Sequence, residues 1–468
     1  MMLLPRGCLD FSDRGLWSRH ATLGDVNTES GIQNERQAFC VPISAFRIHF
    51  LLEQNPIRER FTMLQGNALV GQSGGPTSVI NASLAGVVET ALKSKSIRRV
   101  FGMRFGIEGV LGNVLLDLGA EPAETWKGLR TTPSSALGSS RLKLKDEHFA
   151  PVLKCLKKYE IRYLFMIGGN DTMDTIHRVV EYARSHGHEM RGVGVSKTVD
   201  NDLFGTDHTP GYPSAARFVA VSVQQAGILA RDMQRVDQFV IFQTVGRSAG
   251  WLPAAAALAK SNPDDAPHIL LLPERPFDRD QFLAAVLKAH KKFGFVLIVC
   301  GEGITTADGS PVTASQTRDK FNNLEFGAMG GTSAAMQLHR IITQEFGWRG
   351  EFQVTESLQM CAADRVVPLD IKEAYSCGKQ AVNLAEKGAS GVMVTITRES
   401  KPDQPYRAGL GTIPLSEVAN HERPLPDNYI TADGMFVTKA FLDYARPLVG
   451  ELPRFTNLKQ QKAKPSKG

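Results

Sequence analysis

Short, solid apolar runs recur along the chain, and most of them are followed by a polar turn and a segment of helical periodicity. In the first such unit, the run Ala68-Leu69-Val70 leads through a glycine-rich turn into a segment whose apolar residues fall at helical spacing, at positions 80, 84, 87, 88 and 91. Further apolar runs occupy residues 163–167, 193–195, 239–242, 269–272 and 295–300. Such an alternation is typical of parallel sheets covered by helices on both faces, so we predict an α/β fold with mostly parallel sheets.

Size, charge and cysteine usage narrow the class of protein. The 468 residues are enough for two or three domains, and no stretch is long and apolar enough to span a bilayer. The formal net charge of +6 owes much to a lysine-rich C-terminal tail, so the body of the chain is near neutral and indicates no nucleic-acid partner. The six cysteines show no metal-ligand spacing, which fits a reducing cytosol. We therefore predict a cytoplasmic protein with neither a nucleic-acid nor a membrane partner.

The two ends of the chain differ from its middle. Residues 1–62 have no clear period and contain acids that targeting peptides avoid, so we predict a poorly ordered N-terminal extension. Residues 454–468 are predicted to form a solvated basic tail.

Two polar segments that follow predicted strands carry most of the chemistry. Ligands of parallel α/β sheets bind beyond the carboxyl ends of the strands, where both segments lie. Segment 168–172 (G-G-N-D-T) can hold phosphate oxygens on backbone N–H groups. Segment 196–202 (S-K-T-V-D-N-D) places a lysine, a hydroxyl and two carboxylates within seven residues. A cation, metal ligands and a base are what phosphoryl transfer requires.

Each of these motifs also has a purely structural interpretation. The glycine turn at 73–78 matches neither a Walker A sequence nor GxGxxG, and glycine turns before helices are commonly only turns. An extended segment would send Asp200 and Asp202 to the same side, with Thr198 beside them. A capped turn, in which these side chains bond their own backbone, is an equally good interpretation. His186 and His188 are predicted to be exposed loop residues, and Trp251 a core residue.

Taken together and in this order, the motifs resemble those of the phosphofructokinase family, and more closely its pyrophosphate-dependent branch, over about residues 66–453. The matching segments are 74–77, 138–141, 168–172, 196–202, 245–247 and 302–303. The resemblance implies two Rossmann-like, three-layer α/β domains that face each other across a cleft. Residues 63–203, with later segments returning to them, would form the domain that binds the phosphate donor. Residues 204–453 would form the sugar-phosphate domain and the C-terminal segments.

The family also implies roles for individual residues. Asp200 would be the base that takes the proton from the sugar C1 hydroxyl, assisted by Lys197, Thr198 and Asp202. The donor would be bound by Gly74, Gly75, Arg141, Gly169, Asn170, Asp171, Thr172 and Lys197. The sugar phosphate would be bound by Thr198, Asp200, Val245, Gly246, Arg247 and Glu302. The implied cofactor is Mg²⁺, with Asp171 and Asn170 as its protein ligands, although a neutral amide is a poorer ligand than the acid that the family often has at position 170.

The donor implied by the resemblance is pyrophosphate rather than ATP. Family members that use ATP have glycine at the positions of Asp171 and Lys197. An aspartate there would occupy the room that the α-phosphate of a nucleotide needs and would repel it. The lysine would offset a buried carboxylate and bind an oxygen of diphosphate. The expected reaction is transfer of a phosphoryl group from pyrophosphate to the 1-hydroxyl of fructose 6-phosphate, reversibly, in glycolysis or gluconeogenesis, by a homo-oligomer.

Several departures from the family pattern keep two other functions open. Asn170, Val245 and Met360 stand where the family has an acid, a methionine and a sugar-phosphate arginine, which would fit a non-catalytic regulatory subunit that binds a sugar phosphate. An ATP-dependent 6-phosphofructokinase is the second alternative. Because some altered positions lie on the sugar side, a seven-carbon ketose phosphate is also a possible acceptor.

Overall fold

The computed structural model describes residues 64–313, 332–401, 404–419, 421–456, 458 and 462–463. The predicted N-terminal extension, residues 1–62, and most of the predicted basic tail lie outside these residues. Everything described belongs to one compact unit, Phe61–Gly468. Within the described ranges no helix has the length and apolar character needed to cross a membrane.

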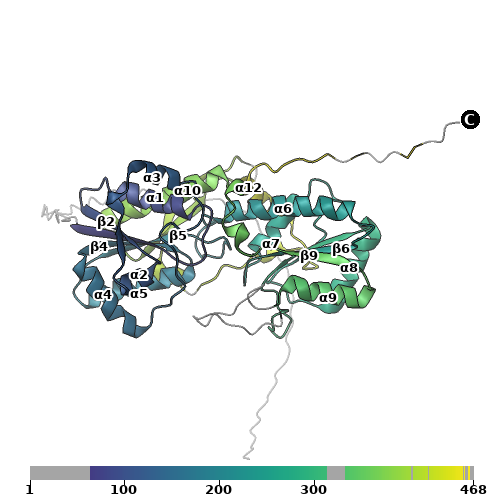
Figure 1. Ribbon diagram of the computed structural model, residues 1–468, viewed down its shortest axis with the longest axis horizontal. Coiled ribbons are helices and arrows are strands. Elements are labelled where there is room, and N and C mark those ends of the chain that lie inside the picture. The colour runs from purple at the N-terminus through teal and green to yellow at the C-terminus, as the bar shows by residue number, and fades with distance from the viewer. Residues whose placement is uncertain are drawn as a thin grey trace, which may run out of the picture. The chain divides into compact units, whose positions relative to one another are not determined.

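The larger of two sheets has seven strands in the order β11-β10-β5-β4-β1-β2-β3. Its pairs are parallel except at the two edges, where β3 pairs antiparallel with β2 and β11 antiparallel with β10. The late strands β10 and β11 therefore lie in the same sheet as strands from the first half of the chain (Figure 1). The strands are β1 Gly66–Gln72, β2 Ile97–Met103, β3 Leu115–Asp117, β4 Ile161–Gly168, β5 Arg191–Ser196, β10 Val392–Arg398 and β11 Ala408–Pro414.

The smaller sheet has four strands in the order β7-β8-β6-β9, and every pair is parallel. The predicted runs at 239–242, 269–272 and 295–300 correspond to three of these strands. The strands are β6 Phe239–Thr244, β7 Ile269–Leu271, β8 Val296–Gly301 and β9 Gly350–Val354. The predicted α/β class with mostly parallel sheets is thus confirmed.

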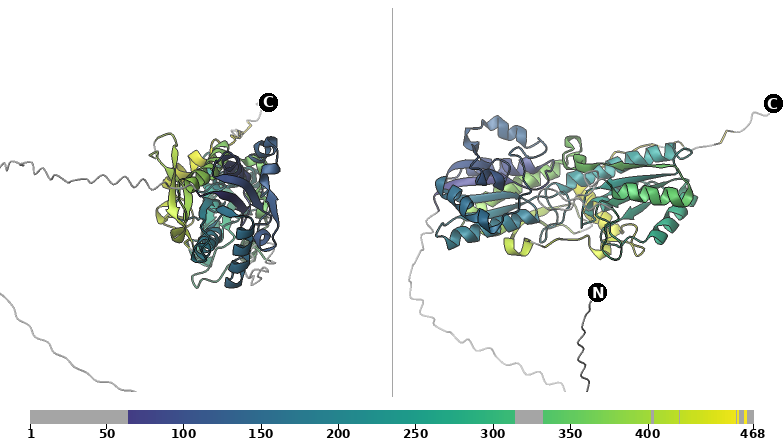
Figure 2. Two further views of the ribbon diagram at one scale, coloured as in Figure 1. Left: turned by 90° about the vertical axis from the view of Figure 1, so that its left-hand side faces the viewer. Right: turned by 60° about the horizontal axis from the view of Figure 1, so that its bottom comes forward.

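Both sheets are covered by helices on both faces, which explains why their central strands are solid apolar runs. On β6, Val240 and Phe242 pack in the core of α6, α7 and α12, whereas Phe239 and Ile241 pack in the core of α8 and α9. In the larger sheet, α1 and α10 cover one face and α4 and α5 the other (Figures 1 and 2). The helices are α1 Ile80–Ala91, α2 Ile107–Leu111, α3 Ala123–Leu129, α4 Asp146–Lys158, α5 Asn170–Ser185, α6 Tyr212–Asp232, α7 Trp251–Ala255, α8 Arg279–Phe293, α9 Ala334–Phe346, α10 Pro368–Glu386, α11 Leu415–Val418 and α12 Lys439–Val449.

The predictions about single side chains meet different outcomes. Trp251 is buried in the core, as predicted, and Cys300 is buried as well. His186 is exposed, but the prediction for His188 is wrong. His188 is buried, and its Nε2 hydrogen-bonds the carbonyl oxygen of Ile161 at 2.8 Å. It follows the end of α5, where the chain turns back toward β5, and this long-range contact has no signature in the local sequence.

Glycines let helices α1 and α10 approach closely. A Cβ atom at Gly378 would lie 2.1 Å from the carbonyl oxygen of Ser83, and one at Gly86 would lie 2.2 Å from the carbonyl oxygen of Tyr375. Both neighbours are backbone atoms, so neither contact can be relieved by turning a side chain. The packing of the layer above the larger sheet therefore depends on the two glycines.

Gly378→Ala should lower the free energy of unfolding by about 1–3 kcal/mol, because the added methyl forces two packed helices apart. Chemical denaturation measures the change. Gly128→Ala, in α3, is the matched control, since its added Cβ would meet no atom within 4 Å. It should be neutral or slightly stabilising, because alanine has the higher helix propensity. Equal effects of the two changes would contradict the close-packing argument.

Candidate functional site

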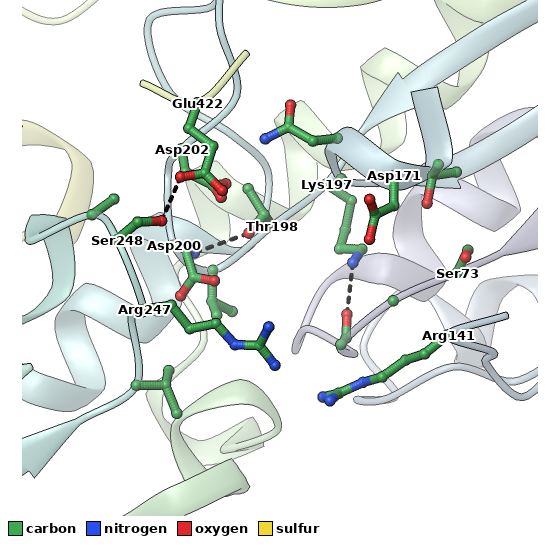
Figure 3. Close-up of a pocket in the computed structure, with 18 of the residues that line it drawn as sticks. Ser73, Arg141, Asp171, Lys197, Thr198, Asp200, Asp202, Arg247, Ser248 and Glu422 are labelled. Atoms are coloured by element: carbon green, nitrogen blue, oxygen red, sulfur yellow. Dashed lines mark hydrogen bonds between the residues drawn. The ribbon is translucent and has the colours of Figure 1, made fainter. Parts of the chain in front are cut away.

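A pocket of about 390 Å³ lies beyond the carboxyl ends of strands from both sheets (Figure 3). The larger sheet contributes the segments that follow β1, β4 and β5, and the smaller sheet those that follow β6 and β8. Every residue that the sequence assigned to the site lines this pocket except Gly246, which lies between two lining residues. The pocket is thus built from distant segments of the chain, as the rule for parallel sheets predicts.

The first glycine loop is held against the segment that carries Arg141. The backbone N–H of Gly74 donates to the carbonyl oxygen of Ser140 at 3.1 Å, and the hydroxyl of Ser139 donates to the carbonyl oxygen of Gly74. Gly74 has a positive φ of 78°, and a Cβ there would lie 3.2 Å from Nζ of Lys197. Glycine therefore both permits the turn and leaves room for the lysine.

Lys197 is buried at the base of the pocket. Its Nζ donates to the carbonyl oxygen of Gly75 at 2.7 Å, so the lysine also holds the glycine loop. Burial lowers the pKa of Lys197 to about 8, against the attraction of the Asp200 and Asp202 carboxylates. The ammonium group therefore bears a charge that an anionic ligand in the pocket would stabilise.

The segment from Thr198 to Asp202 is a turn, so the extended geometry considered for it is wrong. Asn201 has a φ of 57°, and the backbone N–H of Asp200 donates to Oγ1 of Thr198 at 3.1 Å. The side-chain oxygen of Asn201 accepts from the N–H of Thr209 at 3.0 Å. A left-handed residue, one local side-chain bond and a bond to the later segment replace strand alternation, yet both carboxylates still line the pocket.

Asp200 lies in surroundings that disfavour its charge. Burial, together with the nearby carboxylates of Asp202 and Glu302, raises the pKa of Asp200 to about 8, although Lys197 and Arg247 oppose the shift. Its Oδ1 atom is buried and has no hydrogen-bond partner among the described residues. An unpartnered carboxylate oxygen facing a pocket is well suited to accept a proton from a bound hydroxyl.

Asp171, at the start of α5, forms its ion pair with Lys143 and not with Lys197. The Lys143 Nζ and Asp171 Oδ1 atoms are 3.1 Å apart, and 69 % of the Asp171 side chain is exposed. The sequence analysis expected Asp171 to be a buried carboxylate whose charge Lys197 offsets, and this expectation is wrong. Asp171 and Lys197 nevertheless line the same pocket (Figure 3). Both are available to a donor there.

Asn170 has a structural reason to be an amide. With its amide nitrogen oriented toward the backbone, it donates to the carbonyl oxygens of Val418 and His421, at 3.1 Å each. An aspartate at this position would place a carboxylate against two carbonyl oxygens, which cannot donate. Asn170 thereby ties the start of α5 to the segment that leads into Glu422.

Glu422 is a pocket residue that sequence reasoning missed. The hydroxyl of Ser248 donates to Oε2 of Glu422 at 2.5 Å (Figure 3). Burial raises the pKa of Asp202, and the Glu422 carboxylate adds to this effect. The guanidinium of the next residue, Arg423, donates to carbonyl oxygens of residues 201, 206 and 207 and so holds this segment beside the Asp200 turn. No local pattern marks Glu422, because it acquires its place through these long-range bonds.

The opposite wall of the pocket is formed by Val245, Arg247, Glu302 and Met360. Burial raises the pKa of Glu302 to about 7, while Arg247 opposes the shift. Gly246 has a φ of 120°, a value that only glycine adopts readily, and it turns the chain between Val245 and Arg247. This wall therefore combines one cation, one carboxyl group and an apolar surface.

A buried charge network supports the turn from the far side. His208 is fully buried and hydrogen-bonds Asp207 at 2.9 Å and Glu373 at 2.7 Å. Tyr406 donates to the other oxygen of Glu373, and Arg398 donates to both oxygens of Asp207. Burial alone would lower the pKa of His208, but its two carboxylate partners raise it to about 9. The network joins the segment after Asp202 to α10 and β10.

The network predicts a pH-dependent contribution to stability. Because the pKa of His208 is higher in the folded protein than the ordinary 6.5, protonation favours folding below about pH 6.5, and this contribution is lost as pH rises through about 9. The shift corresponds to roughly 3 kcal/mol. His208→Gln should therefore destabilise the protein strongly at pH 6 and much less at pH 10, as measured by urea denaturation of both proteins. A difference that does not vary with pH would contradict this assignment.

Comparisons with known proteins agree on one family. A family model for phosphofructokinase matches residues 67–385. The chain is 39 % identical over 399 residues to a pyrophosphate–fructose 6-phosphate 1-phosphotransferase from Xanthomonas campestris, an alignment that covers 84 % of this chain and 93 % of the relative. A protein of the same name from Methylococcus capsulatus is 38 % identical over 394 residues, with 83 % and 92 % of the two chains covered. The crystal structure of a pyrophosphate-dependent phosphofructokinase from Nitrosospira multiformis superposes with a TM-score of 0.75 at 35 % identity, covering 85 % of this chain and 95 % of that one.

Proposed function

The chain belongs to the phosphofructokinase family, and we infer from this membership that it is an enzyme that transfers a phosphoryl group from pyrophosphate to fructose 6-phosphate. The products are fructose 1,6-bisphosphate and phosphate, and the reaction is reversible. The observation that carries the choice of donor is that Asp171, Lys197 and Asp200 line one pocket in a chain whose relatives are named for pyrophosphate. The substrates are therefore pyrophosphate and fructose 6-phosphate.

We propose that the sugar phosphate lies along the wall formed by Val245, Arg247 and Glu302, with its 1-hydroxyl directed at Asp200. Asp200 takes the hydroxyl proton as the oxygen attacks phosphorus, and its unpartnered Oδ1 atom supports this role. The Glu302 carboxyl group can hydrogen-bond sugar hydroxyls, and the Arg247 guanidinium can bind a phosphate. Thr198 caps the turn that aims Asp200, so its role is to position the base.

We propose that the donor lies between the glycine loops, with Arg141 and Lys197 bearing its charge. Gly169 and the first residues of α5 line the same pocket, and the N-terminus of a helix can bind phosphate oxygens through its free backbone N–H groups. Gly74 and Gly75 let the backbone approach the donor closely. The negative charge of the transferred group is spread over its oxygens, and the protein has little covalent chemistry to perform. Catalysis therefore rests on positioning and electrostatic stabilisation.

Enzymes of this family are generally Mg²⁺-dependent, and the pocket suits a hard cation. Within the described residues no three or more His, Cys, Asp or Glu side chains form a metal cluster. Mg²⁺ is commonly held by one or two carboxylates together with substrate phosphates. Asp202 and Glu422 could provide these oxygens. The two carboxylates are close enough for the charge of Glu422 to raise the pKa of Asp202. The roles of Asp171 and Asn170 as ligands remain predictions, since both side chains have protein partners. When bound, Mg²⁺ would neutralise phosphate charge.

A single assay tests the proposed function against its alternatives. Purified protein is given Mg²⁺ and fructose 6-phosphate with either pyrophosphate or ATP, and fructose 1,6-bisphosphate is measured. Turnover with pyrophosphate alone is expected. Turnover with ATP alone would overturn the donor, and turnover with neither would favour a regulatory subunit. Met360 makes the wall formed with Val245, Arg247 and Glu302 more apolar than an arginine would, so the acceptor also needs a test. Replacing fructose 6-phosphate by a seven-carbon ketose phosphate in the same assay provides it.

Assembly and location are proposals of the same kind. We propose a homo-oligomer in the cytosol, supported by the resemblance to a family that completes parts of its sites from neighbouring subunits. Size-exclusion chromatography with light scattering would test the assembly.

A further inference from the structure

Lys143 faces the pocket from the same segment as Arg141. Residues 141–145 follow the loop that is bonded to Gly74, and exposure alternates along them, with Arg141 and Lys143 exposed and Leu144 buried. Side chains two positions apart on an extended segment point to the same side. Both cations line the pocket. The segment thus presents two positive charges to one space.

The backbone around Lys143 is held at both ends. Upstream, the Ser140 hydroxyl donates to Glu108 at 2.6 Å and accepts from the N–H of Leu142 at 3.0 Å. Downstream, Arg178 of α5 donates to the carbonyl oxygen of Leu144 at 3.1 Å. Since α5 also carries Asp171, the lysine and its partner are fixed to the same helix. The fold therefore places both residues within reach of each other, and their side chains form an ion pair at 3.1 Å.

The ion pair leaves Lys143 able to bind a further anion. An ammonium group has three N–H donors, and the ion pair joins it to a single carboxylate, that of Asp171. The lysine side chain is 58 % exposed, so its remaining donors are accessible from the pocket. Asp171 by itself would repel an anionic donor, and Lys143 compensates its charge. Asp171 therefore acts on the pocket mainly through Lys143.

The two lysines lie near different groups. The charge of Lys197 acts on Asp200 and Asp202, where the phosphoryl group is transferred. Lys143 instead pairs with Asp171 in the first turn of α5, and the main charges that act on Asp200 do not include it. A donor that spans the pocket would place its transferred phosphorus near Lys197 and its leaving phosphate near Lys143. The group that leaves from pyrophosphate is a terminal phosphate. The corresponding group in ATP is the β-phosphate, which is also bonded to the α-phosphate and therefore carries less negative charge.

We propose, on the basis of the proposed function, that Lys143 is a second donor-binding lysine and that Asp171 is a positioning residue that directs it toward the leaving phosphate of pyrophosphate. In the reverse reaction the same lysine would bind inorganic phosphate. The Asp171–Lys143 pair would then contribute to donor choice by recognising a terminal phosphate, in addition to any steric exclusion of a nucleotide.

The first test is Lys143→Met, which keeps the aliphatic stem and removes the charge. The KM for pyrophosphate, and the KM for phosphate in the reverse reaction, should rise about tenfold. The KM values for fructose 6-phosphate and fructose 1,6-bisphosphate should change less than twofold. Lys154→Met, an exposed lysine of α4 that does not line the pocket, is the matched control and should leave all four constants unchanged. If Lys143→Met behaves like this control in an active enzyme, the assignment is overturned.

The second test is a double-mutant cycle with Asp171→Asn. If Asp171 acts through Lys143, Asp171→Asn should raise the KM for pyrophosphate severalfold in the wild-type protein. In the Lys143→Met variant, the same change should have little further effect on this KM. Equal effects in both backgrounds would overturn the positioning role of Asp171. A wild-type protein without pyrophosphate-dependent turnover would instead overturn the proposed function, and this assignment with it.

Discussion

Asp200→Asn should lower kcat for pyrophosphate-dependent phosphorylation of fructose 6-phosphate by about 10³-fold, with KM values within a few-fold of the wild type. An amide of nearly the same shape cannot accept the hydroxyl proton, and removal of a general base typically costs 10²–10⁴-fold. The unpartnered Oδ1 atom and the surrounding charges support our proposal that Asp200 is the base. Steady-state kinetics in both directions measure the effect.

The fold should tolerate this substitution. Burial disfavours the ionised carboxylate of Asp200, so exchanging it for a neutral amide removes an unfavourable charge. We therefore expect the thermal unfolding midpoint to stay unchanged or to rise, which would separate loss of chemistry from loss of structure. Asp308→Asn, at an exposed turn, is the control for removal of a carboxylate. Asp200→Asn with wild-type kcat would exclude Asp200 as the base.

The double variant Asp171→Gly with Lys197→Gly should lower kcat/KM for pyrophosphate by about 10³-fold. Loss of Lys197 removes a buried cation beside Asp200 and Asp202, and hydrogen bonds to charged groups contribute about 1.5–3 kcal/mol each. It also removes the bond from Nζ to the Gly75 carbonyl oxygen, which helps to hold the glycine loop. Loss of Asp171 releases Lys143 from its ion pair.

The same variant tests the exclusion of nucleotides. With two glycines, the pocket loses the side chains that were predicted to obstruct the α-phosphate, so we expect measurable turnover with ATP where the wild type has none. Lys197→Met alone is the informative companion, because it removes the charge while still filling the space. It should lose pyrophosphate turnover without gaining ATP turnover. Unchanged kinetics with pyrophosphate in the double variant would remove both residues from donor binding.

Much of the fold could be predicted from the sequence because buried parallel strands are solid apolar runs. The runs at 163–167 and 239–242 fall within β4 and β6, and the polar segments after them lie in one pocket. Strands with mixed exposure were not found by this signal. β9 and β11 lie at sheet edges, where half-exposed positions interrupt the apolar pattern. Their places depend on pairing with partners remote in the sequence.

The candidate site shows the same division between local and long-range information. The resemblance to family motifs assigned Lys197, Asp200 and Arg247 to the site, and all three line the pocket. The sequence analysis assigned Asp171 the wrong charge partner, and it missed Glu422, which belongs to no motif. Lys143 could have been found from its spacing to Arg141, but its ion pair could not.

The order of strands, glycine turns and charged motifs along the chain was enough to determine the family and the class of chemistry, because each of these features is encoded within a few adjacent residues. The tertiary structure decided which charge meets which: Lys143 with Asp171, Ser248 with Glu422, and Asn170 with two backbone carbonyls. Hydrogen bonds and close ion pairs act over a few ångströms. Segments far apart in sequence must therefore be brought together before their partners are defined.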